Sequence, residues 1–306
     1  MYNSSDPRAS LAPQPSGTAQ SAAATRFAAA EYARFYADPP QVSDSFSRQW
    51  YARGQNFVLV YIEAESGAAF SRADQPDEYV VLLPDASTAV AVECQGQQHA
   101  LPGYTIAFVP PGSSRIVVEK PGRVVLMFTT RSADLCALCG NAASYAEAHP
   151  HIPPFEAWPE PVGGMKFRPY SLDVPEVPGR FGRIWRCTTF MVNFLPAQFG
   201  PRDVTKLSPH HHDSFEQASL ALEGSFMHHI RWPWTPNLHA WRADDHEHCG
   251  SPSLAVIPPP AIHTSRGLDE GANQLVDVFS PPRMDFSLKP GWVLNEADYP
   301  MPTPPA

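Results

Sequence analysis

The chain has 306 residues, of which 22 are Lys or Arg and 31 are Asp or Glu, so its formal charge at pH 7 is −9. This acidic balance argues against the basic surface that proteins use to bind DNA or RNA, and we expect no nucleic-acid partner. A hydrophobic fraction of 43% and a charged fraction of 17% are typical of a folded chain of two modest domains or one large one.

Proline is the unusual residue of the composition. The chain has 35 prolines and 18 glycines, so many turns and few long helices are expected. No stretch approaches the ~18 uncharged apolar residues of a membrane span, and residues 1–10 lack the pattern of a signal peptide. The odd number of cysteines, five, indicates reduced thiols rather than a disulfide framework. We therefore expect a soluble, cytoplasmic protein with no membrane partner.

Residues 1–25 are rich in Ser, Ala, Pro and Gly, and residues 1–45 are predicted to be a flexible arm with a short helix. Within this arm, the Ala-rich stretch from Ala22 to Tyr36 predicts a short helix that ends before Pro39. Residues 46–131 then contain short β-type runs such as NFVLVYIEA and RVVLMFTT, separated by turn residues. This pattern of short apolar runs and turns predicts an antiparallel β domain.

A second β domain is predicted after a linker. Residues 132–165 combine a helical pattern, SADLCALCGNAASYAEA, with a proline-rich stretch, which is typical of an interdomain connection. Residues 166–306 return to short β-type runs. The predicted fold class is therefore all-β, with two β domains, a helical and proline-rich linker, and a short N-terminal helical arm.

The two β blocks look like weak repeats of each other. Glu78, at the start of EYVVLLPD, matches Gln217 at the start of QASLALEG, and Pro110 of FVPPG matches Pro258 of VIPPP. The second copy would carry an insertion at residues 232–241. Repeated antiparallel units with this density of turns predict a pair of jelly-roll barrels.

The strongest local signal is the internal run His210, His211 and His212. Successive side chains of a strand alternate between its faces, so His210 and His212 are expected to point the same way. Imidazole is a common ligand of Zn, Fe, Ni and Cu, and two on one strand need only one or two more donors. His263, which follows a proline-rich turn, is the natural candidate.

These motifs resemble those of the cupin superfamily. The first cupin motif has two His one residue apart, then a Glu and then a Gly, and the second is Pro-x-Gly-x-x-His. In the first motif of this chain Gln217 stands at the Glu position, and in the second Pro260 replaces Gly. The resemblance implies a two-domain cupin, or bicupin, whose C-terminal barrel binds one divalent metal per chain (Fe, Mn, Ni or Zn). The implied metal ligands are His210, His212, Gln217 and His263.

Gln217 is the informative departure from the motif. A neutral amide oxygen leaves the metal more positive than a carboxylate would, which favours an anionic or enediol-type ligand. The adjacent Glu216 could ligate in its place if the backbone bulges. The alternative for the three histidines is a solvated loop cluster without a metal.

The N-terminal block lacks the metal motif. Ser71 and Ala73 stand at the positions of the two His, Glu78 at that of the Glu, and Arg115 at that of the third His. One carboxylate and one guanidinium do not make a usual metal site, so this barrel is predicted to be degenerate, with a structural or interfacial role. A Glu78–Arg115 ion pair, or a small anion held by Arg115, could occupy the former site.

Two cysteines could suggest a second metal site. Cys136 and Cys139 form a CxxC pair, with His149 and His151 downstream. Because the pair lies in a helical pattern and no second CxxC follows, we expect half-buried helix cysteines rather than zinc ligands.

Further candidates follow Gly224. His228 and His229 are neighbours on a predicted strand, so one of them should face the barrel interior, and we predict catalytic roles for both and for Glu216. Arg231 and Trp232 border the insertion and are predicted to contact substrate as part of a lid. The alternative for the insertion is a packed surface hairpin.

Three classes of function remain, because cupins host many chemistries on one fold. The leading one is a metal-dependent enzyme, of the dioxygenase type, acting on a small carbonyl, enediol or catechol-like anion. The second is a redox-neutral isomerase or decarboxylase of a sugar acid or keto acid, and the third is a non-catalytic module that binds a small ligand. The N-terminal arm could support a homodimer.

Overall fold

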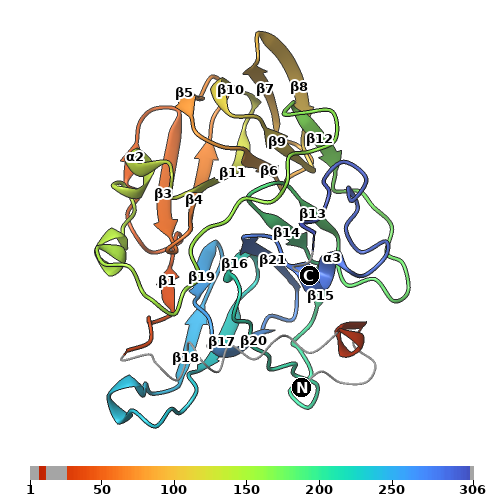
Figure 1. The fold of residues 1–306 in the computed structure, drawn as a ribbon. Coiled ribbons are helices and arrows are strands. Elements are labelled where there is room, and N and C mark those ends of the chain that lie inside the picture. The colour runs from red at the N-terminus through yellow and green to blue at the C-terminus, as the bar shows by residue number, and fades with distance from the viewer. Residues whose placement is uncertain (1–6, 12–25, 304–306) are drawn as a thin grey trace.

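The computed structural model describes residues 7–11 and 26–303 (Figure 1). Within these ranges the helices are single turns, and strands arranged in four sheets make up the architecture, which confirms the all-β class. The short helices are η1 (Pro7–Ser10), α2 (Ala133–Cys136), η2 (Ala142–Tyr145), η3 (Leu238–Ala240) and α3 (Met284–Ser287).

The N-terminal barrel pairs a seven-stranded sheet, in the order β12-β9-β6-β11-β4-β3-β2, with a four-stranded sheet, β5-β10-β7-β8. All the strand pairs in these two sheets are antiparallel. The strands are β2 (Val42–Ser43), β3 (Ser47–Arg53), β4 (Phe57–Ala64), β5 (Ala69–Gln75), β6 (Tyr79–Leu83), β7 (Ala89–Cys94), β8 (Gln97–Pro102), β9 (Thr105–Val109), β10 (Gly112–Lys120), β11 (Gly122–Thr129) and β12 (Arg168–Ser171).

The C-terminal barrel lies below the first one in Figure 1 and repeats its plan. Its larger sheet has the order β1-β19-β16-β21-β14-β13, with β15 paired to β21, and its smaller sheet is β18-β17-β20. The strands are β1 (Glu31–Ala33), β13 (Ile184–Arg186), β14 (Met191–Phe194), β15 (Gln198–Phe199), β16 (Glu216–Glu223), β17 (Phe226–Arg231), β18 (Asp245–Cys249), β19 (Ser253–Ile257), β20 (Ile262–Gly267) and β21 (Ala272–Ser280).

Two short strands are exchanged between the barrels. β1, from the N-terminal arm, pairs with β19 of the C-terminal barrel, and β12, which follows the linker, pairs with β9 of the N-terminal barrel. The helix predicted for residues 22–36 is therefore wrong where the structure describes it, because the sheet edge and the burial of Phe35 outweigh the helix propensity of alanine. Residues 22–25 lie outside the described residues.

The two large sheets pack against each other, so their strands are buried on both faces. On β4, Leu59 and Tyr61 belong to the hydrophobic cluster between the barrels, whereas Val60 and Ile62 belong to the cluster inside the N-terminal barrel. This explains why the strands read as continuous apolar runs rather than as alternating ones. On β16 the face toward the other barrel carries apolar side chains such as Leu220, and the opposite face is polar.

Two buried glutamates join the barrels in a symmetric way. Glu216 accepts hydrogen bonds from the backbone N–H groups of Gln55 (2.8 Å) and Asn56 (2.7 Å), at the turn between β3 and β4. Glu78 accepts from the backbone N–H of Thr188 (3.0 Å), between β13 and β14, and from the Tyr299 hydroxyl (2.6 Å). Each carboxylate thus binds the equivalent turn of the other barrel. Burial raises the pKa of Glu216 to about 7.

This symmetry corrects the alignment of the two repeats. Glu78 corresponds to Glu216, and Tyr79 corresponds to Gln217, since Tyr79 pairs with Val109 as Gln217 pairs with Ile257. Tyr79 lies inside the N-terminal barrel at the place of the predicted metal ligand.

The ion pair considered for Glu78 and Arg115 does not form in the structure. The Glu78 carboxylate is buried at the contact between the barrels, while Arg115 is exposed on β10.

The linker contains short turns of helix rather than one long helix. Cys136 and Cys139 lie in and just after α2, and their thiols donate to the carbonyl oxygens of Thr130 (3.6 Å) and Leu135 (3.4 Å). Both cysteines are buried, and burial raises the pKa of the Cys139 thiol to about 12. Neutral thiols bonded to backbone carbonyls agree with the structural interpretation of this pair and not with zinc ligands.

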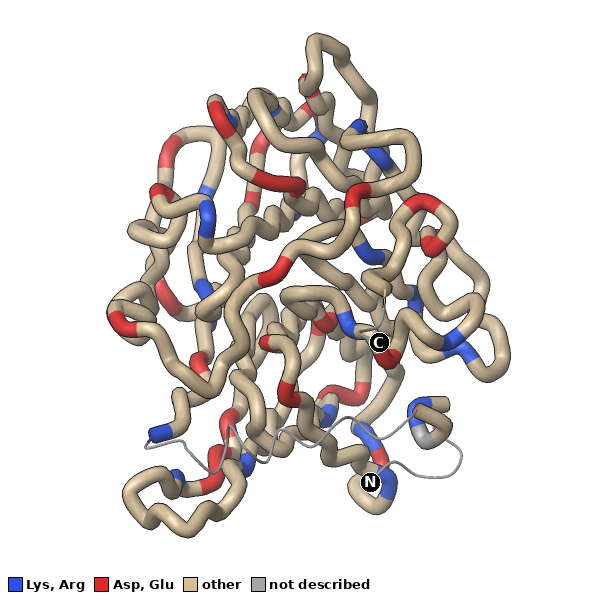
Figure 2. The backbone as a smooth tube through the Cα atoms, in the orientation of Figure 1, with Lys and Arg blue, Asp and Glu red and all other residues tan. Residues whose placement is uncertain are grey.

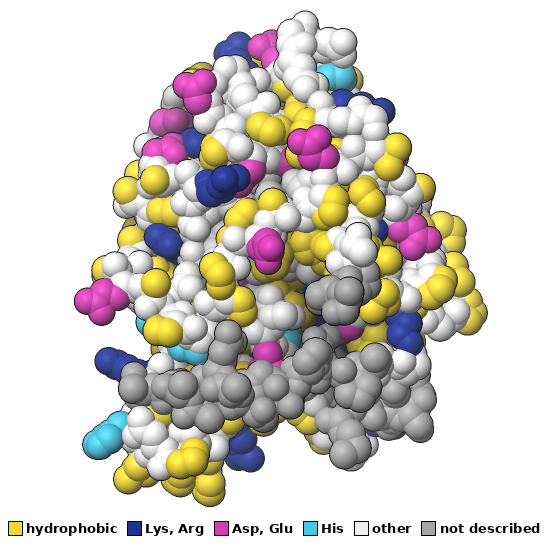
Figure 3. Space-filling view, in the orientation of Figure 1, with side chains coloured by type: hydrophobic (Ala, Val, Ile, Leu, Met, Phe, Trp, Pro, Cys, Tyr) yellow, Lys and Arg dark blue, Asp and Glu magenta, His cyan; other side chains and the backbone are white. Residues whose placement is uncertain are grey.

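The surface mixes charges of both signs. Figure 2 shows Lys and Arg interspersed with Asp and Glu along both barrels. In the described ranges, no helix has the length and apolar character needed to cross a membrane. The loop between β17 and β18 projects at the lower left of Figure 3, where apolar side chains gather; the exposed Trp234 and Trp241 rings stack there with centroids 4.5 Å apart.

Candidate metal centre

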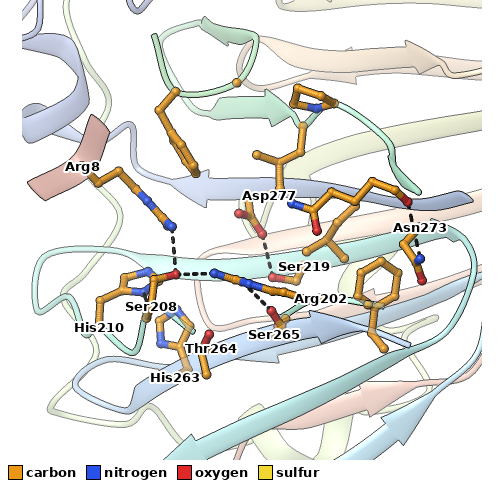
Figure 4. A pocket seen from close by; sticks show the side chains of 18 of the residues that line it. Arg8, Arg202, Ser208, His210, Ser219, His263, Thr264, Ser265, Asn273 and Asp277 are labelled. Atoms are coloured by element: carbon orange, nitrogen blue, oxygen red, sulfur yellow. Dashed lines mark hydrogen bonds between the residues drawn. The ribbon is translucent and has the colours of Figure 1, made fainter. Parts of the chain in front are cut away.

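The interior of the C-terminal barrel encloses a cavity of about 430 Å³ (Figure 4). Its walls come from both sheets of the barrel, since β16 and β21 supply one side and β17 and β20 the other. His210, Gln217 and His263 line this cavity. The residues chosen from the sequence motifs therefore meet at one place inside the barrel.

Backbone pairing brings the two histidine motifs together. The N–H of His210 donates to the carbonyl of His263 (3.1 Å), and the N–H of His263 donates to the carbonyl of His210 (2.8 Å). This antiparallel bridge places the two imidazoles side by side, with ring centroids 4.4 Å apart, and His212 lies 5.0 Å from His263. The proline-rich turn before His263 positions the second motif for this bridge.

The three imidazoles share one hydrogen-bonding arrangement. In each of them Nδ1 faces a backbone carbonyl oxygen, which can only accept, so Nδ1 carries the proton and Nε2 carries the lone pair. A ligand histidine usually has its other ring nitrogen fixed in this way. The bonds are His210 to Ser208 (3.0 Å), His212 to Phe215 (3.0 Å) and His263 to Ala261 (2.9 Å).

The side-chain oxygen of Gln217 faces the Nε2 atoms of two of the histidines. Gln217 Oε1 lies 3.2 Å from Nε2 of His212 and 3.2 Å from Nε2 of His263. Its amide nitrogen donates to Ser219 Oγ (3.1 Å) and to Asp277 Oδ1 (3.3 Å), and this fixes the oxygen toward the histidines. With the imidazole protons on Nδ1, all three facing atoms are acceptors, and a cation among them would bind their lone pairs. The donor set therefore fits a divalent metal.

The imidazoles are held neutral, as ligands must be. Burial lowers the pKa of His263 to about 4, and it lowers the pKa values of His210 and His212 well below their usual range. The His263 imidazole and the Arg283 guanidinium also disfavour a positive charge on His212.

His210 lies beside His263 but farther from His212. Its ring centroid lies 6.4 Å from that of His212, and in the described parts of the chain no three His, Cys, Asp or Glu side chains form a metal-ligand cluster. The convergent set is two imidazoles and an amide oxygen, with His210 alongside. The structure brings all four predicted ligands together, and their coordination of a metal stays a prediction.

Glu216 does not belong to this site. It precedes Gln217 on β16, so its side chain points to the opposite face and binds the other barrel. The ligand and catalytic roles considered for Glu216 are corrected by this alternation.

Of the two histidines on β17, His228 faces inward and His229 outward. His228 is fully buried behind the cavity wall, where its Nδ1 lies 2.7 Å from the hydroxyl of Ser265, which lines the cavity. Burial lowers the pKa of His228 to about 3. His229 lies on the outer face and pairs with His246 (2.8 Å), so a direct catalytic role for His229 is not supported.

The structure places both residues of the predicted substrate contacts, Arg231 and Trp232, away from the cavity lining. Arg231 is exposed and its guanidinium binds the carboxylate of Asp244 (2.9 Å). Trp232 is buried outside the cavity, and its indole N–H donates to the carbonyl of Ala28 (3.0 Å). The insertion thus packs against the N-terminal arm instead of covering the barrel mouth, as in the surface-hairpin alternative.

The cavity also contains residues that sequence reasoning missed. Ser219 and Asp277 are direct partners on β16 and β21, and Ser219 Oγ donates to Asp277 Oδ1 (2.7 Å). Burial raises the pKa of Asp277. The sequence carries a signal for Asp277, because an aspartate inside the apolar run LVDVF is unusual for a buried strand.

The charge of the described cavity lining is positive. Its four basic side chains outnumber its one carboxylate, that of Asp277. The basic residues are Arg8, Arg180, Arg202 and Lys206.

Several solved structures are similar to this chain over most of its length. AerE from Microcystis aeruginosa superposes with a TM-score of 0.53 at 8% identity, covering 84% of this chain and 100% of that one. Oxalate decarboxylase from Lactobacillus farciminis, in a formate complex, gives 0.55 at 11%, covering 85% and 89%. A single-residue variant of oxalate decarboxylase from Bacillus subtilis gives 0.51 at 11%, covering 83% and 78%.

The chain has a two-domain cupin fold. The prediction of two jelly-roll barrels is thereby confirmed, and at these identities the likeness shows the fold alone. No protein-family model and no curated protein matches the chain. The bicupin's function is therefore argued from its own site.

Proposed function

We propose that the C-terminal barrel of this bicupin is the active site of a divalent-metal-dependent enzyme that acts on a small anionic substrate. The observation that carries the proposal is the convergence of Nε2 of His212 and Nε2 of His263 on Oε1 of Gln217, while each Nδ1 faces a backbone carbonyl oxygen. With His210 beside them, these residues would hold one Fe, Mn, Ni or Zn ion. When bound, such an ion would polarise a substrate oxygen as a Lewis acid.

The charges of the site favour an anion. The implied ligands are all neutral, so they would not offset the charge of a divalent ion. The basic residues of the cavity lining add to this positive potential. A substrate carboxylate or enediolate would therefore be attracted to the site.

The surrounding residues orient the donors and offer contacts for a substrate. Ser219 and Asp277 hold the Gln217 amide so that its oxygen faces inward. Thr264 Oγ1, which is buried at the cavity wall, has no hydrogen-bond partner among the described residues and could donate to a substrate oxygen.

Two reaction classes remain proposals. The first is an oxygenase reaction, the leading sequence prediction, which the neutral, imidazole-rich ligand set supports. A redox-neutral isomerase or decarboxylase reaction is favoured by the Ser219–Asp277 pair, which places a carboxyl group beside the donors for proton transfer. Two of the similar structures are oxalate decarboxylases by name, which agrees with the second class.

An oxygen-uptake assay on the metal-loaded protein separates these classes. Catechol-like, enediol and 2-oxo acid compounds would be tested in air with an oxygen electrode, and without oxygen for CO₂ release or isomerised product. Turnover that is lost in His263→Ala and retained in the exposed-histidine control His248→Ala supports the proposal. Metal binding without turnover of any class would favour the non-catalytic module, and turnover unchanged in His263→Ala would refute the site.

A further inference from the structure

The cavity of the C-terminal barrel has a cationic side and an apolar side. The cationic side lies next to the candidate metal donors, and Ser208 joins the two. Its carbonyl oxygen faces Nδ1 of His210, and its hydroxyl oxygen accepts hydrogen bonds from Arg8 and Arg202. The apolar side consists of Phe181, Leu195, Pro196, Phe226 and Leu275.

Two guanidinium groups converge on one hydroxyl group at the cationic side (Figure 4). Nη2 of Arg8 and Nη2 of Arg202 each donate to Ser208 Oγ at 2.9 Å. Arg202 is held in place by a second bond, from Nη1 to the carbonyl of Ser265 (2.9 Å). Planar guanidinium groups suit carboxylates, which can accept two parallel hydrogen bonds.

Arg8 reaches this place from the other end of the chain. It lies in η1, its guanidinium carbon is 4.1 Å from the ring centroid of Phe181, and the residue is only 9% exposed. Leu11, just after η1, packs against a hydrophobic cluster of the C-terminal barrel. The N-terminal segment 7–11 is therefore part of the cavity wall.

The apolar side follows from the alternation of β21. Asn273, Leu275 and Asp277 face the cavity, and Leu275 is the apolar one of the three. Phe226 faces the cavity from β17, and Leu195 follows β14. Leu275 and Leu195 are half-buried, so part of their apolar surface remains open to a ligand.

We infer that the substrate is a carboxylate with an apolar side chain, of the aryl or branched-alkyl 2-oxo acid class; this inference rests on the function proposed above. Its carboxylate binds Arg8 and Arg202, its 2-oxo group faces the metal donors, and its side chain packs against Leu275 and Phe226. A cavity of about 430 Å³ lies in the range of sites for larger organic ligands and far exceeds the needs of a two-carbon diacid. The buried hydroxyl group of Thr264 provides a donor for an oxygen of such a ligand.

Calorimetric titration with three matched probes tests this inference. Phenylpyruvate carries both features, pyruvate lacks the aryl group, and phenylacetone lacks the carboxylate. We expect phenylpyruvate to bind at least about tenfold more tightly than either of the others, because each lacks one of the two contacts. Leu275→Ser should remove the advantage over pyruvate, and Arg202→Gln the advantage over phenylacetone, while Arg202→Lys should retain part of the latter.

The controls separate this inference from the proposed function. Leu238→Ser changes an exposed leucine outside the cavity and should leave the ranking of the probes intact. Metal content is measured on every sample, and the titrations are repeated on chelator-treated protein. If the wild type holds no metal, even after reconstitution, but still binds phenylpyruvate more tightly than the other two probes, the proposed function is contradicted and this inference is not. Equal binding of phenylpyruvate and pyruvate would overturn the apolar side of the inference, and equal binding of phenylacetone would overturn the cationic side.

Discussion

Replacing Glu216 with alanine should destabilise the protein by about 3 kcal/mol and leave metal binding unchanged. The buried carboxylate is the acceptor for the backbone N–H groups of Gln55 and Asn56, at 2.8 and 2.7 Å. Each buried donor that loses its acceptor costs about 1–3 kcal/mol, and removal of a buried charge offsets part of the sum. The adjacent Gln217 faces the other way, so the metal donors keep their positions.

Urea denaturation followed by tryptophan fluorescence would give the loss of stability, and elemental analysis would give the metal content. Glu216→Gln is the matched control, because its amide oxygen can still accept one of the two bonds, and it should cost less than Glu216→Ala. A Glu216→Ala protein of unchanged stability, or one that has lost its metal, would refute the assignment of Glu216 to the contact between the barrels.

The remaining predictions concern other parts of the same account. Gln217→Leu should reduce metal affinity by at least about tenfold with little loss of stability, as measured by competition with a chromophoric chelator; unchanged affinity would exclude Gln217 as a ligand. For Glu78, burial raises the pKa of the carboxyl group, so its contribution to stability is present at low pH and is lost as pH rises through the raised value. Denaturation from about pH 4 to about pH 8 should therefore show the stability of the wild type falling relative to Glu78→Gln, and a constant difference would contradict this. Arg231→Gln should leave turnover and KM unchanged, because the Arg231 side chain binds Asp244 at the surface. A raised KM would instead support the predicted contact of Arg231 with substrate.

The residues of the candidate metal site could be selected from the sequence because their signal is local. His210 and His212 are one residue apart in the first motif, and the turn before His263 has a recognisable pattern, so the motifs were enough to select residues that meet in the fold. The strand expected for residues 210–212 is reduced to an isolated bridge at His210. Glu216 and Gln217 could not be separated in this way. Their roles depend on which face of β16 meets the other barrel, and this contact is formed by residues more than a hundred positions away.

The missed cavity residues have the same explanation. Asp277 reaches the site because β21 pairs with β16, and Arg8 because η1 packs against the C-terminal barrel. The sequence predicts a helix over the exchanged strand β1 because the surrounding stretch, Ala22 to Tyr36, is rich in alanine, whereas the pairing of β1 with β19 decides its conformation. Local patterns thus predicted the elements and motifs, and long-range packing determined which side chains complete the site.

The central claim is that the convergent acceptors of the C-terminal barrel hold a divalent metal. Elemental analysis of untagged protein, purified without chelators and reconstituted in turn with Fe, Mn, Ni and Zn, tests it most directly when wild type and His212→Ala are compared. We predict a stoichiometric metal in the wild type and its loss from His212→Ala, with circular dichroism showing that the variant retains its β-sheet content. A wild type that binds no metal, or a variant that retains a stoichiometric one, would contradict the claim.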